Sequence, residues 1–368
     1  MQGGGGQKGM KKIKALVVDD SAYNRMTITK MLEGDPGIEV AGAAGDGIDA
    51  ITKTLRLQPD VITLDLEMPT MDGYTFLRWL MKERPTPVLV LSSRSDSRSV
   101  FRAMELGAVD FLAKPEARIS RSIEGLREEL TAKIYAVLNL KMSKVQSAME
   151  LIAKGPAPDP AGREDSAPQE RGSIDVVAIA SSTGGPPALQ AILAALPQRF
   201  GAGIVISQHM PPGFTRSFAE RLNKLSALMV SEAEAGDRVL PGRVLITPGG
   251  YHLLVRKEGA NLAVELVPRV PEDVYVPSAD RMMVTVADAC GAAALGVVLT
   301  GMGRDGAEGV AAIKRQGGQC LAESEESAVV FGMPQEAIRT GAVDKVLPLG
   351  MLAGEILRRC SRNRSGLT

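Results

Sequence analysis

Short apolar runs alternate with helical patterns twice along the chain, and this alternation limits the folds that the chain can adopt. In the first half the apolar runs lie at 13–18, 38–43, 60–64, 87–91 and 109–112. Helical patterns separate them near 21–33, 47–57, 72–83 and 97–106, and a longer one covers about 120–152. Such alternation is typical of a parallel sheet that helices cover on both faces. The sequence therefore predicts a doubly wound (βα)5 domain over 11–142.

The alternation begins again in the second half. Strand-like runs lie near 174–180, 204–208, 228–233, 243–247 and 296–300. Helical patterns lie near 186–195, 213–225, 278–290 and 305–316. Residues 251–256 and 261–267, joined through KEGAN, predict an antiparallel hairpin. We therefore expect a second α/β/α domain over 173–360, with a mostly parallel sheet and one hairpin.

The two halves are separated by a segment that has little to bury. Residues 154–173 read KGPAPDPAGREDSAPQERGS, a composition typical of a linker, which we place over 143–172. The glycine-rich residues 1–10 and the last residues, 361–368, are expected to be tails. A chain of 368 residues is long enough for two domains with separate cores.

Composition excludes several classes of protein. Lys plus Arg and Asp plus Glu both number 43, so nucleic acid is not an expected partner. The three cysteines lack metal-site spacing, which favours reduced thiols and a cytoplasmic location. No apolar run reaches the roughly 18–20 residues that span a bilayer, so no direct membrane insertion is expected.

Acidic and other polar residues follow the predicted strands of the first half. Asp19 and Asp20 follow the first strand and Asp65 the third, while Ser92 and Lys114 follow the last two. Ligands of open parallel sheets bind beyond the carboxyl ends of the strands. Clustered carboxylates suit a hard cation such as Mg²⁺, and a neighbouring ammonium and hydroxyl would stabilise a phosphoryl group. The alternative, that Asp19 and Asp20 merely start a helix at 21, does not account for the other three residues.

These motifs carry a resemblance to a known family. ALVVDDSAYNR, DVITLDLEMPTMDG, PVLVLSS and GAVDFLAKP resemble a response-regulator receiver domain over roughly 11–140. The resemblance implies Asp65 as the phosphoacceptor, with Asp19 and Asp20 supporting Mg²⁺. It also implies Ser92 as the switch hydroxyl, Phe111 as the switch aromatic residue and Lys114 as the phosphate-binding lysine. A histidine kinase would then be the phosphodonor.

A serine-containing turn opens the second half. In VVAIASSTGGPPALQAIL (176–193) an apolar run ends in serines, a threonine and glycines, and a helical pattern follows. Such a turn exposes side chains beside free helix N–H groups, which favours a nucleophile, although G-x-S-x-G is absent. Of the two histidines, His209 ends the next strand and is the candidate base, while His252 is expected to be a partly exposed hairpin residue. Asp305 follows a further strand, and it would either orient the imidazole or cap a helix.

A second resemblance rests on IASSTGGPPAL, SQHMPPGFTRSFAERLN, EAGDRVLPGRVLITPGG, GVVLTGMGRDGAEG and VVFGMPQEAI. These segments, over roughly 173–350, are similar to the catalytic domain of the chemotaxis protein-glutamate methylesterases. The resemblance implies Ser182 as nucleophile, His209 as base and Asp305 as its partner. The family pattern reads I-G-A-S-T-G-G, so a serine at 181 and an alanine at 180 depart from it. In that turn we expect the Thr183 backbone N–H to bind the oxyanion, and Met302 to shape the pocket.

The resemblance implies an esterase whose Ser-His-Asp triad hydrolyses glutamate methyl esters, and deamidates glutamine, on methyl-accepting chemotaxis receptors. Phosphorylation of Asp65 would activate it, and the esterase reaction itself would need no cofactor. Two alternatives stay open from the residues alone. One is a Rossmann-like module whose STGGPP turn binds a nucleotide phosphate, although its glycine spacing and the Gln208-His209 strand end do not fit. The other is a catalytically inactive interaction domain.

Overall fold

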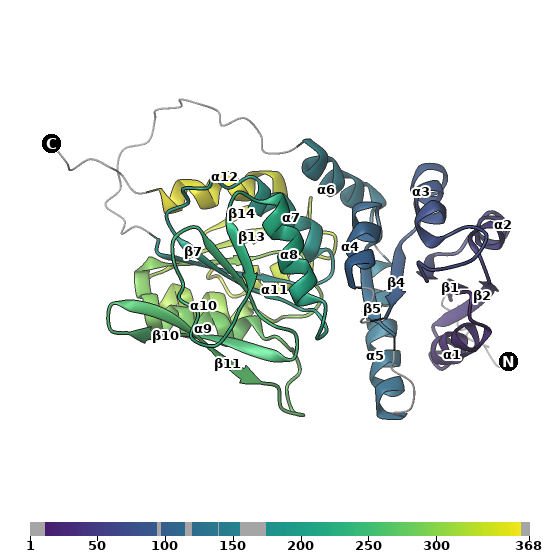
Figure 1. Cartoon of the computed structure of the whole chain (residues 1–368), viewed down its shortest axis with the longest axis horizontal. Coiled ribbons are helices and arrows are strands. Elements are labelled where there is room, and N and C mark those ends of the chain that lie inside the picture. The colour runs from purple at the N-terminus through teal and green to yellow at the C-terminus, as the bar shows by residue number, and fades with distance from the viewer. Residues whose placement is uncertain (1–11, 94–96, 115–119, 139, 155–173, 362–368) are drawn as a thin grey trace, which may run out of the picture. The chain divides into compact units, whose positions relative to one another are not determined.

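A computed structural model describes residues 12–93, 97–114, 120–138, 140–154 and 174–361 (Figure 1). The chain divides into two compact units. The first unit contains residues 1–93 and 106–139, and the second contains 94–105 and 140–368. Each unit is built on its own sheet.

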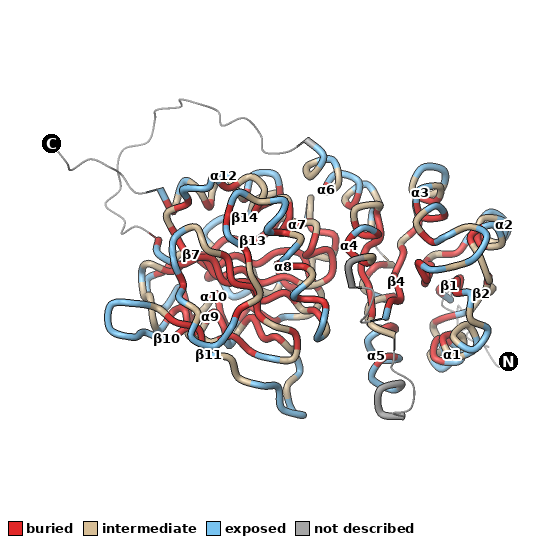
Figure 2. Tube along the Cα trace, viewed as in Figure 1, coloured by how far each residue is buried: buried red, intermediate tan, exposed pale blue. Residues whose placement is uncertain are grey.

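The first unit is a five-stranded parallel sheet in the order β2-β1-β3-β4-β5. Its strands are β1 (Ile13–Val18), β2 (Ile38–Ala44), β3 (Val61–Leu64), β4 (Val88–Ser92) and β5 (Asp110–Ala113). Its helices are α1 (Ala22–Glu33), α2 (Gly47–Leu57), α3 (Gly73–Glu83) and α5 (Ser120–Val137), while α4 (Ser97–Glu105) groups with the second unit. Every residue of β3 and β4 is buried, as Figure 2 shows in red for β4, which explains why their sequences are mostly apolar rather than alternating. The predicted doubly wound fold is confirmed.

The second unit is a seven-stranded parallel sheet in the order β14-β13-β12-β6-β7-β9-β8. Its strands are β6 (Val176–Ser181), β7 (Gly203–Gln208), β8 (Met229–Glu232), β9 (Arg243–Ile246), β12 (Ala294–Val298), β13 (Gln319–Glu323) and β14 (Lys345–Leu347). Its helices are α6 (Met142–Lys154), α7 (Gly185–Ala194), α8 (Thr215–Leu225), α9 (Ala279–Cys290), α10 (Ala307–Arg315), α11 (Met333–Arg339) and α12 (Leu349–Cys360), with a short 3-10 turn, η2 (Gly291–Ala293). The predicted second α/β domain is confirmed. The sequence patterns did not reveal β13, β14, α11 and α12.

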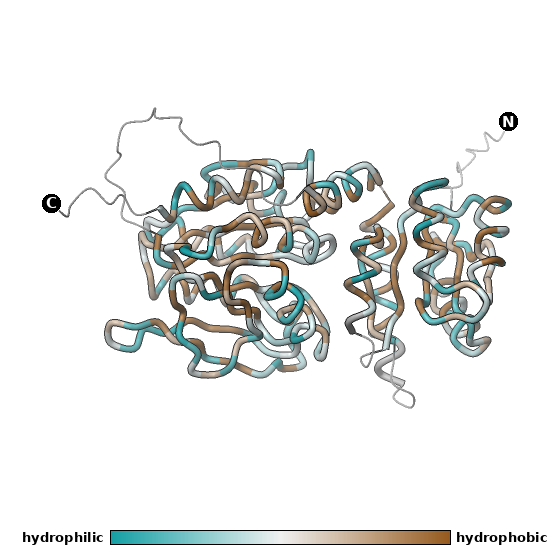
Figure 3. Tube along the Cα trace, turned by 45° about the horizontal axis from the view of Figure 1, so that its top comes forward, coloured by the Kyte–Doolittle hydropathy of each residue, from teal (hydrophilic) through white to brown (hydrophobic). Residues whose placement is uncertain are grey.

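The predicted hairpin is also confirmed, as a separate two-stranded sheet of β10 (Tyr251–Glu258) and β11 (Asn261–Pro268). Its inner side chains, including Leu253 and Val264, join one apolar core with Val205 of the main sheet and Met282 and Val286 of α9. Helix α9 therefore lies between the hairpin and the sheet. Figure 3 shows the hydrophobic strands in the interior of this unit and hydrophilic residues around the β10–β11 turn.

The single helix predicted over 120–152 is wrong, because two helices, α5 and α6, cover this stretch. The reason is that the apolar faces of the two helices pack within different units. Helix α5 packs on β5 and buries Leu130 and Ile134, whereas α6 packs on α7 and buries Val145. The predicted linker, 143–172, therefore begins inside α6, and its remainder from 155 lies outside the described residues, as do the predicted tail 1–10 and most of 361–368.

Candidate active site

The serine turn lies where the strand order of the second sheet reverses direction. Strand β6 pairs with β7 on one side and with β12 on the other, so the residues after these three strands meet at one edge. Ser182 follows β6, His209 follows β7, and Asp305 comes six residues after Leu299, the residue that follows β12. Ligand sites of open α/β sheets lie at such a reversal, beyond the carboxyl ends of the strands.

The turn between β6 and α7 needs its glycines. Gly184 has φ +77° and immediately precedes the helix. A Cβ at this position would also lie 2.6 Å from Cβ of Val329. A side chain at Gly185 would lie 2.1 Å from Oε1 of Gln208. The two glycines thus let the chain turn sharply while Gln208 packs directly against it.

The two neighbouring serines have different surroundings. Ser181 is fully buried, and its hydroxyl donates to Oε1 of Gln208 at 2.7 Å. The Gln208 amide in turn donates to the carbonyl oxygens of Ser182 (3.0 Å) and His209 (3.1 Å). Ser182 is only partly buried. The accessible hydroxyl of the turn is therefore that of Ser182, and Ser181 and Gln208 hold the turn beneath it.

His209 and Asp305 lie in direct contact. Nε2 of His209 is 2.8 Å from Oδ2 of Asp305, whose residue is 1 % exposed. An aspartate oxygen only accepts, so Nε2 carries the hydrogen and Nδ1 is left as the basic nitrogen. Burial acts to raise the pKa of Asp305, but the hydrogen bond and charge of His209, with backbone N–H donors, outweigh it and hold that pKa below its usual value.

Asp305 also caps a helix, but not the helix that follows it. Its carboxylate accepts hydrogen bonds from Ser278 Oγ (3.1 Å), Ala279 N (2.6 Å) and Asp280 N (2.9 Å), at the start of α9. Asp280 does the same for α10, accepting from the N–H groups of Gly306 and Gly309. The capping role and the contact with His209 therefore coexist, since Asp305 has oxygens enough for both.

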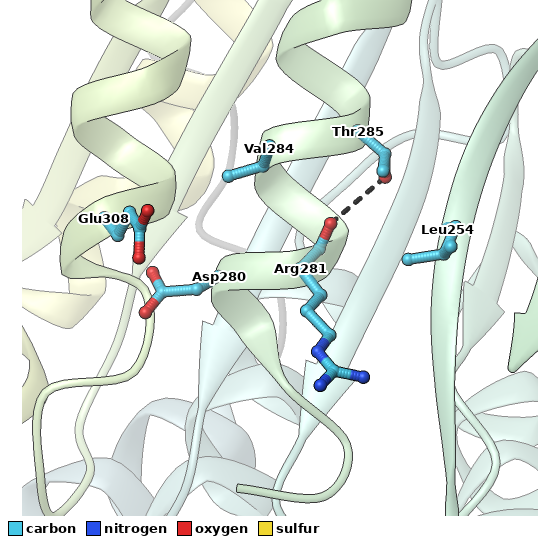
Figure 4. A pocket seen from close by; sticks show the side chains of 6 residues that line it. All are labelled: Leu254, Asp280, Arg281, Val284, Thr285 and Glu308. Atoms are coloured by element: carbon cyan, nitrogen blue, oxygen red, sulfur yellow. Dashed lines mark hydrogen bonds between the residues drawn. The ribbon is translucent and has the colours of Figure 1, made fainter. Parts of the chain in front are cut away.

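A shallow pocket of about 380 Å³ opens beside these helix starts (Figure 4). In Figure 4 Asp280 and Glu308 point toward each other between α9 and α10. Burial, together with the charge of Asp305, raises the pKa of Asp280 to about 6.

His252 is fully buried, so the expectation of a partly exposed hairpin residue is wrong. Its Nε2 bonds Asp273 Oδ2 at 2.8 Å, and its Nδ1 accepts from the N–H of Ser278 at 3.1 Å. The reason is that the loop before α9, which supplies Asp273 and Ser278, packs on this side of the hairpin, and the sequence around His252 does not reveal that contact. His252 therefore helps to fix Ser278, one of the donors to Asp305, and does not face the serine turn.

The structure places the remaining candidates of this site close to Ser182. Thr183 is buried, and its carbonyl accepts from Thr300 Oγ1 at 2.9 Å. Met302 is partly buried and follows Gly301, where an added Cβ would lie 2.8 Å from Cβ of Ser182. In the described part of the chain no side-chain hydrogen bond joins Ser182 to His209. The roles of Thr183 and Met302 stay predictions.

The first unit brings its predicted phosphoryl site together at the carboxyl ends of β1, β3 and β5. Lys114 Nζ lies 2.6 Å from Oδ2 of Asp65 and 2.9 Å from Oδ2 of Asp19. Carboxylate oxygens of Asp19, Asp20 and Asp65 all lie within 4.8 Å of one another. Three carboxylates in this arrangement supply the oxygen ligands that Mg²⁺ prefers, so the residues fit that ion. Burial raises the pKa of Asp65, and the contact with Lys114 partly offsets this effect.

The local alternative for the acidic pair does not explain its geometry. The N-cap of α1 is Ser21, whose side chain accepts from the N–H of Asn24. Asp19 supports this start through the N–H of Ser21, yet its Oδ2 also pairs with Lys114. Asp20 is exposed beside it. Asp19 therefore serves both the helix start and the carboxylate cluster.

The two predicted switch residues are buried and do not contact the carboxylates through a described hydrogen bond. The Ser92 hydroxyl donates to the carbonyl of Ser93 at 3.3 Å. Phe111 points inward, and Nζ of Lys133 lies 5.9 Å from the centre of its ring. Lys133 also donates to Asp110 at 2.7 Å and to the Phe111 carbonyl at 3.0 Å. Their roles as switch residues stay predictions.

Comparisons with known proteins match both units of the chain. The family model for the CheB methylesterase matches residues 177–356, and that for the response regulator receiver domain matches 15–124. A protein-glutamate methylesterase/protein-glutamine glutaminase of Geobacter sulfurreducens is 51% identical over 95% of this chain and 98% of its own length. This chain belongs to the CheB methylesterase family. A second relative of the same name, from Myxococcus xanthus, is 47% identical over 96% of this chain and 98% of its own length.

Solved structures similar to parts of this CheB-family chain include two from Thermotoga maritima. The CheB methylesterase catalytic domain of that organism is 41% identical to this chain. The match covers 50% of this chain and 98% of the domain, with a TM-score of 0.49. The response regulator domain of the CheB from that organism is 39% identical to this chain. The match covers 36% of this chain and 99% of the domain, with a TM-score of 0.34. In the described part of this chain, no helix is both long and apolar enough to cross a bilayer.

Two residues of this CheB-family site escaped sequence reasoning. Tyr275 stacks on His209, with ring centres 5.2 Å apart and planes 10° apart. Gln208 supports the serine turn from beneath. An aromatic residue in a loop gives no distinct signal, because its contact depends on how the segment before α9 folds back. Gln208 could have been noticed, since it precedes His209 at a strand end.

Proposed function

We propose that this chain hydrolyses the methyl esters of glutamate side chains, and deamidates glutamine, on methyl-accepting chemotaxis receptors. The names of the relatives suggest both substrates, because an ester and an amide at the same γ-carbonyl differ only in the leaving group. The observation that carries the proposal is the accessible Ser182 hydroxyl at the strand-order reversal, beside a His209 that Asp305 orients. A cytoplasmic location follows from these substrates as part of the proposal.

In the proposed mechanism, His209 acts through Nδ1 because Asp305 holds Nε2–H. Nδ1 removes the proton from the Ser182 hydroxyl while Oγ attacks the γ-carbonyl carbon of the substrate. The imidazolium then gives its proton to the departing methoxide, so methanol leaves and an acyl-serine remains. Water, deprotonated by the same nitrogen, attacks the acyl-serine and releases glutamate. Deamidation follows the same steps with ammonia as the leaving group.

Three backbone contacts would keep the nucleophile in place during these steps. The N–H of Ser182 donates to the Thr300 carbonyl at 3.0 Å, and the Ser182 carbonyl accepts from Gly185 N at 2.8 Å and from Gln208. Tyr275 stacks on the His209 ring and restricts its rotation. The N–H of Thr183 is proposed as an oxyanion donor, and Met302 as part of the pocket wall. A fixed turn of this kind lowers the reorganisation needed to reach the transition state.

The first unit is proposed to regulate the esterase through phosphorylation of Asp65 by a histidine kinase. Mg²⁺, held by Asp19, Asp20 and Asp65, would neutralise phosphate oxygens. Asp65 Oδ would attack the phosphorus of the kinase's phosphohistidine, the P–N bond would break with the imidazole as leaving group, and Lys114 would pair with the phosphoryl group now on Asp65. Ser92 and Phe111 are proposed to change position in response. The proposed division is a receiver over 11–142 and a catalytic domain over 173–360, and α6, which packs on α7, groups with the catalytic part and not with a linker.

The direct test is methanol release from methylated chemoreceptors in membranes. We expect purified full-length protein to release methanol, and a small phosphodonor with Mg²⁺ to raise that rate. Glutamine deamidation should be followed in parallel by mass spectrometry of the receptor. No methanol release with or without phosphodonor, from protein that is folded by circular dichroism, would favour an inactive interaction domain instead.

Asp305→Asn is expected to lower kcat by about 10²- to 10⁴-fold while KM stays nearly constant. The amide can still accept from α9. Its NH₂ group, however, can donate to Nε2 of His209 only if the imidazole takes the wrong tautomer, in which Nδ1 carries the hydrogen and cannot act as the base. The measurement is the rate of methanol release at saturating receptor. Asp280→Asn is the matched control, because Asp280 caps α10 without touching His209. Equal losses in both variants would assign the effect to helix capping alone.

A further inference from the structure

Glu323 is a buried carboxyl that the proposed mechanism does not use. It ends β13, a strand that the sequence patterns did not reveal, and is 1 % exposed. One oxygen, Oε2, accepts from the backbone N–H of Thr300 at 2.8 Å. The other, Oε1, accepts from the Ser327 hydroxyl at 2.9 Å, and Ser327 Oγ accepts from Leu349 N at 2.9 Å. Both oxygens are therefore engaged.

Thr300 connects this carboxyl to the nucleophile turn. Its carbonyl accepts from Ser182 N at 3.0 Å, and its hydroxyl donates to the Thr183 carbonyl at 2.9 Å. The same hydroxyl accepts from Val330 N at 2.9 Å. Thr300 thus holds the turn on both sides of the Ser182–Thr183 peptide bond. Glu323 in turn holds Thr300 by accepting a hydrogen bond from its N–H. Each link is a described hydrogen bond of ordinary length.

The buried carboxyl is costly for the protein. Burial raises the pKa of Glu323 to about 7, although hydrogen bonds from Thr300 and Ser327 and the charge of Lys144 act to lower it. Lys144, on α6, also donates to the carbonyl of Ala328 at 3.1 Å, in the loop that follows β13. The partner of this buried carboxyl group is a backbone N–H beside the active site. The role that best accounts for its burial is therefore to hold that backbone in position.

We propose that Glu323 is a positioning residue for the esterase: through Thr300 it holds the Ser182–Thr183 turn in the geometry needed for nucleophilic attack. The inference rests on the proposed function, since it assigns Glu323 a role in the same reaction. Glu323 does not touch the substrate in this assignment. Its removal should therefore affect the chemical step and leave receptor binding intact, because an error of about 1 Å at a nucleophile costs about 10²-fold in rate.

The test compares Glu323→Ala, Glu323→Gln and Asp344→Ala in the full-length protein, with methanol release from methylated receptor as the assay. Asp344 is the matched control, because its carboxylate accepts from Cys320 N at 2.7 Å near the other end of β13. We expect Glu323→Ala to lower kcat about 10²-fold with KM within about 2-fold of wild type. Glu323→Gln keeps an oxygen for Thr300 N and should retain activity within about 3-fold. Asp344→Ala should change kcat by less than about 2-fold.

A second variant keeps the inference testable if Glu323→Ala does not fold. Thr300→Val preserves shape and the backbone bond to Glu323 but removes the hydroxyl that holds Thr183. It should lower kcat about 10-fold with KM unchanged, and slow the labelling of Ser182 by a fluorophosphonate in the same proportion. Unchanged kcat in folded Glu323→Ala or in Thr300→Val, or an equal loss in Asp344→Ala, would overturn the inference. Wild-type protein without esterase activity would instead overturn the proposed function.

Discussion

Ser182→Ala is expected to abolish methyl ester hydrolysis, with kcat falling on the order of 10⁵-fold. The reason is that Ser182 carries the accessible hydroxyl of the turn, and without Oγ no acyl-enzyme can form. The fold should survive, since the hydroxyl of Ser182 makes none of the described hydrogen bonds that hold the turn; these use its backbone N–H and carbonyl. Methanol release from methylated receptor measures the loss, and thermal unfolding of the same preparation checks the fold.

Ser181→Ala is the matched control, one residue away. It removes the hydrogen bond to Gln208 Oε1 and leaves that buried oxygen without this donor, which costs about 1–3 kcal/mol of stability. Because Gln208 steadies the turn, kcat should fall only about 2- to 10-fold. If Ser181→Ala were inactive and Ser182→Ala active, the nucleophile would be Ser181, and the turn would have to rearrange to expose it.

The sequence was sufficient to predict which side chains of each sheet gather at one edge. Parallel strands present their carboxyl ends together, so residues that directly follow apolar runs, such as Asp65 and Ser182, were placed correctly by pattern alone. The pairing of β6 with both β7 and β12 brings His209 and Asp305 to the same edge. For these residues, a place directly after a parallel strand in the sequence means a place at the carboxyl edge of the sheet.

Other parts of the site depend on packing between segments far apart in the chain. Asp305 caps α9, whose first residue is 26 positions earlier, whereas its local sequence suggested the capping of α10 as the alternative to orienting the imidazole. His252 is buried against the loop that precedes α9, which supplies Asp273 and Ser278, and the same loop brings Tyr275 to His209. The sequence analysis did not single out Glu323, since β13 was not predicted and its partner Thr300 comes from the end of the neighbouring strand. No periodic pattern encodes such contacts.

The acceptor carboxyl of the first unit can be tested independently of the esterase. Gly73 begins α3 directly against Asp65, and a Cβ at Gly73 would lie 2.4 Å from the Asp65 carbonyl oxygen. The backbone of Asp65 is fixed further by its N–H bond to the Val18 carbonyl at 2.8 Å. The carboxyl is therefore held at one place at the edge of the sheet, with Lys114 beside it. A rigid acceptor of this kind favours in-line attack on a phosphodonor.

Asp65→Asn is expected to eliminate phosphoryl incorporation from a small phosphodonor in the presence of Mg²⁺, because an amide oxygen is too weak a nucleophile to form the acyl phosphate. The fold should survive: the amide keeps an oxygen for Lys114, and, being uncharged, it avoids the cost of burying a charge that raises the pKa of Asp65. The measurement is the mass increase of one phosphoryl group, sensitive to hydroxylamine.

Asp60→Asn is the control, since Asp60 accepts from Lys14 N and precedes the same strand at its opposite end. It should be labelled like wild type, and Asp65→Asn should show only basal methanol release that phosphodonor does not raise. Full labelling of Asp65→Asn would place the acceptor elsewhere, and Asp19 or Asp20 would then be the residues to replace next.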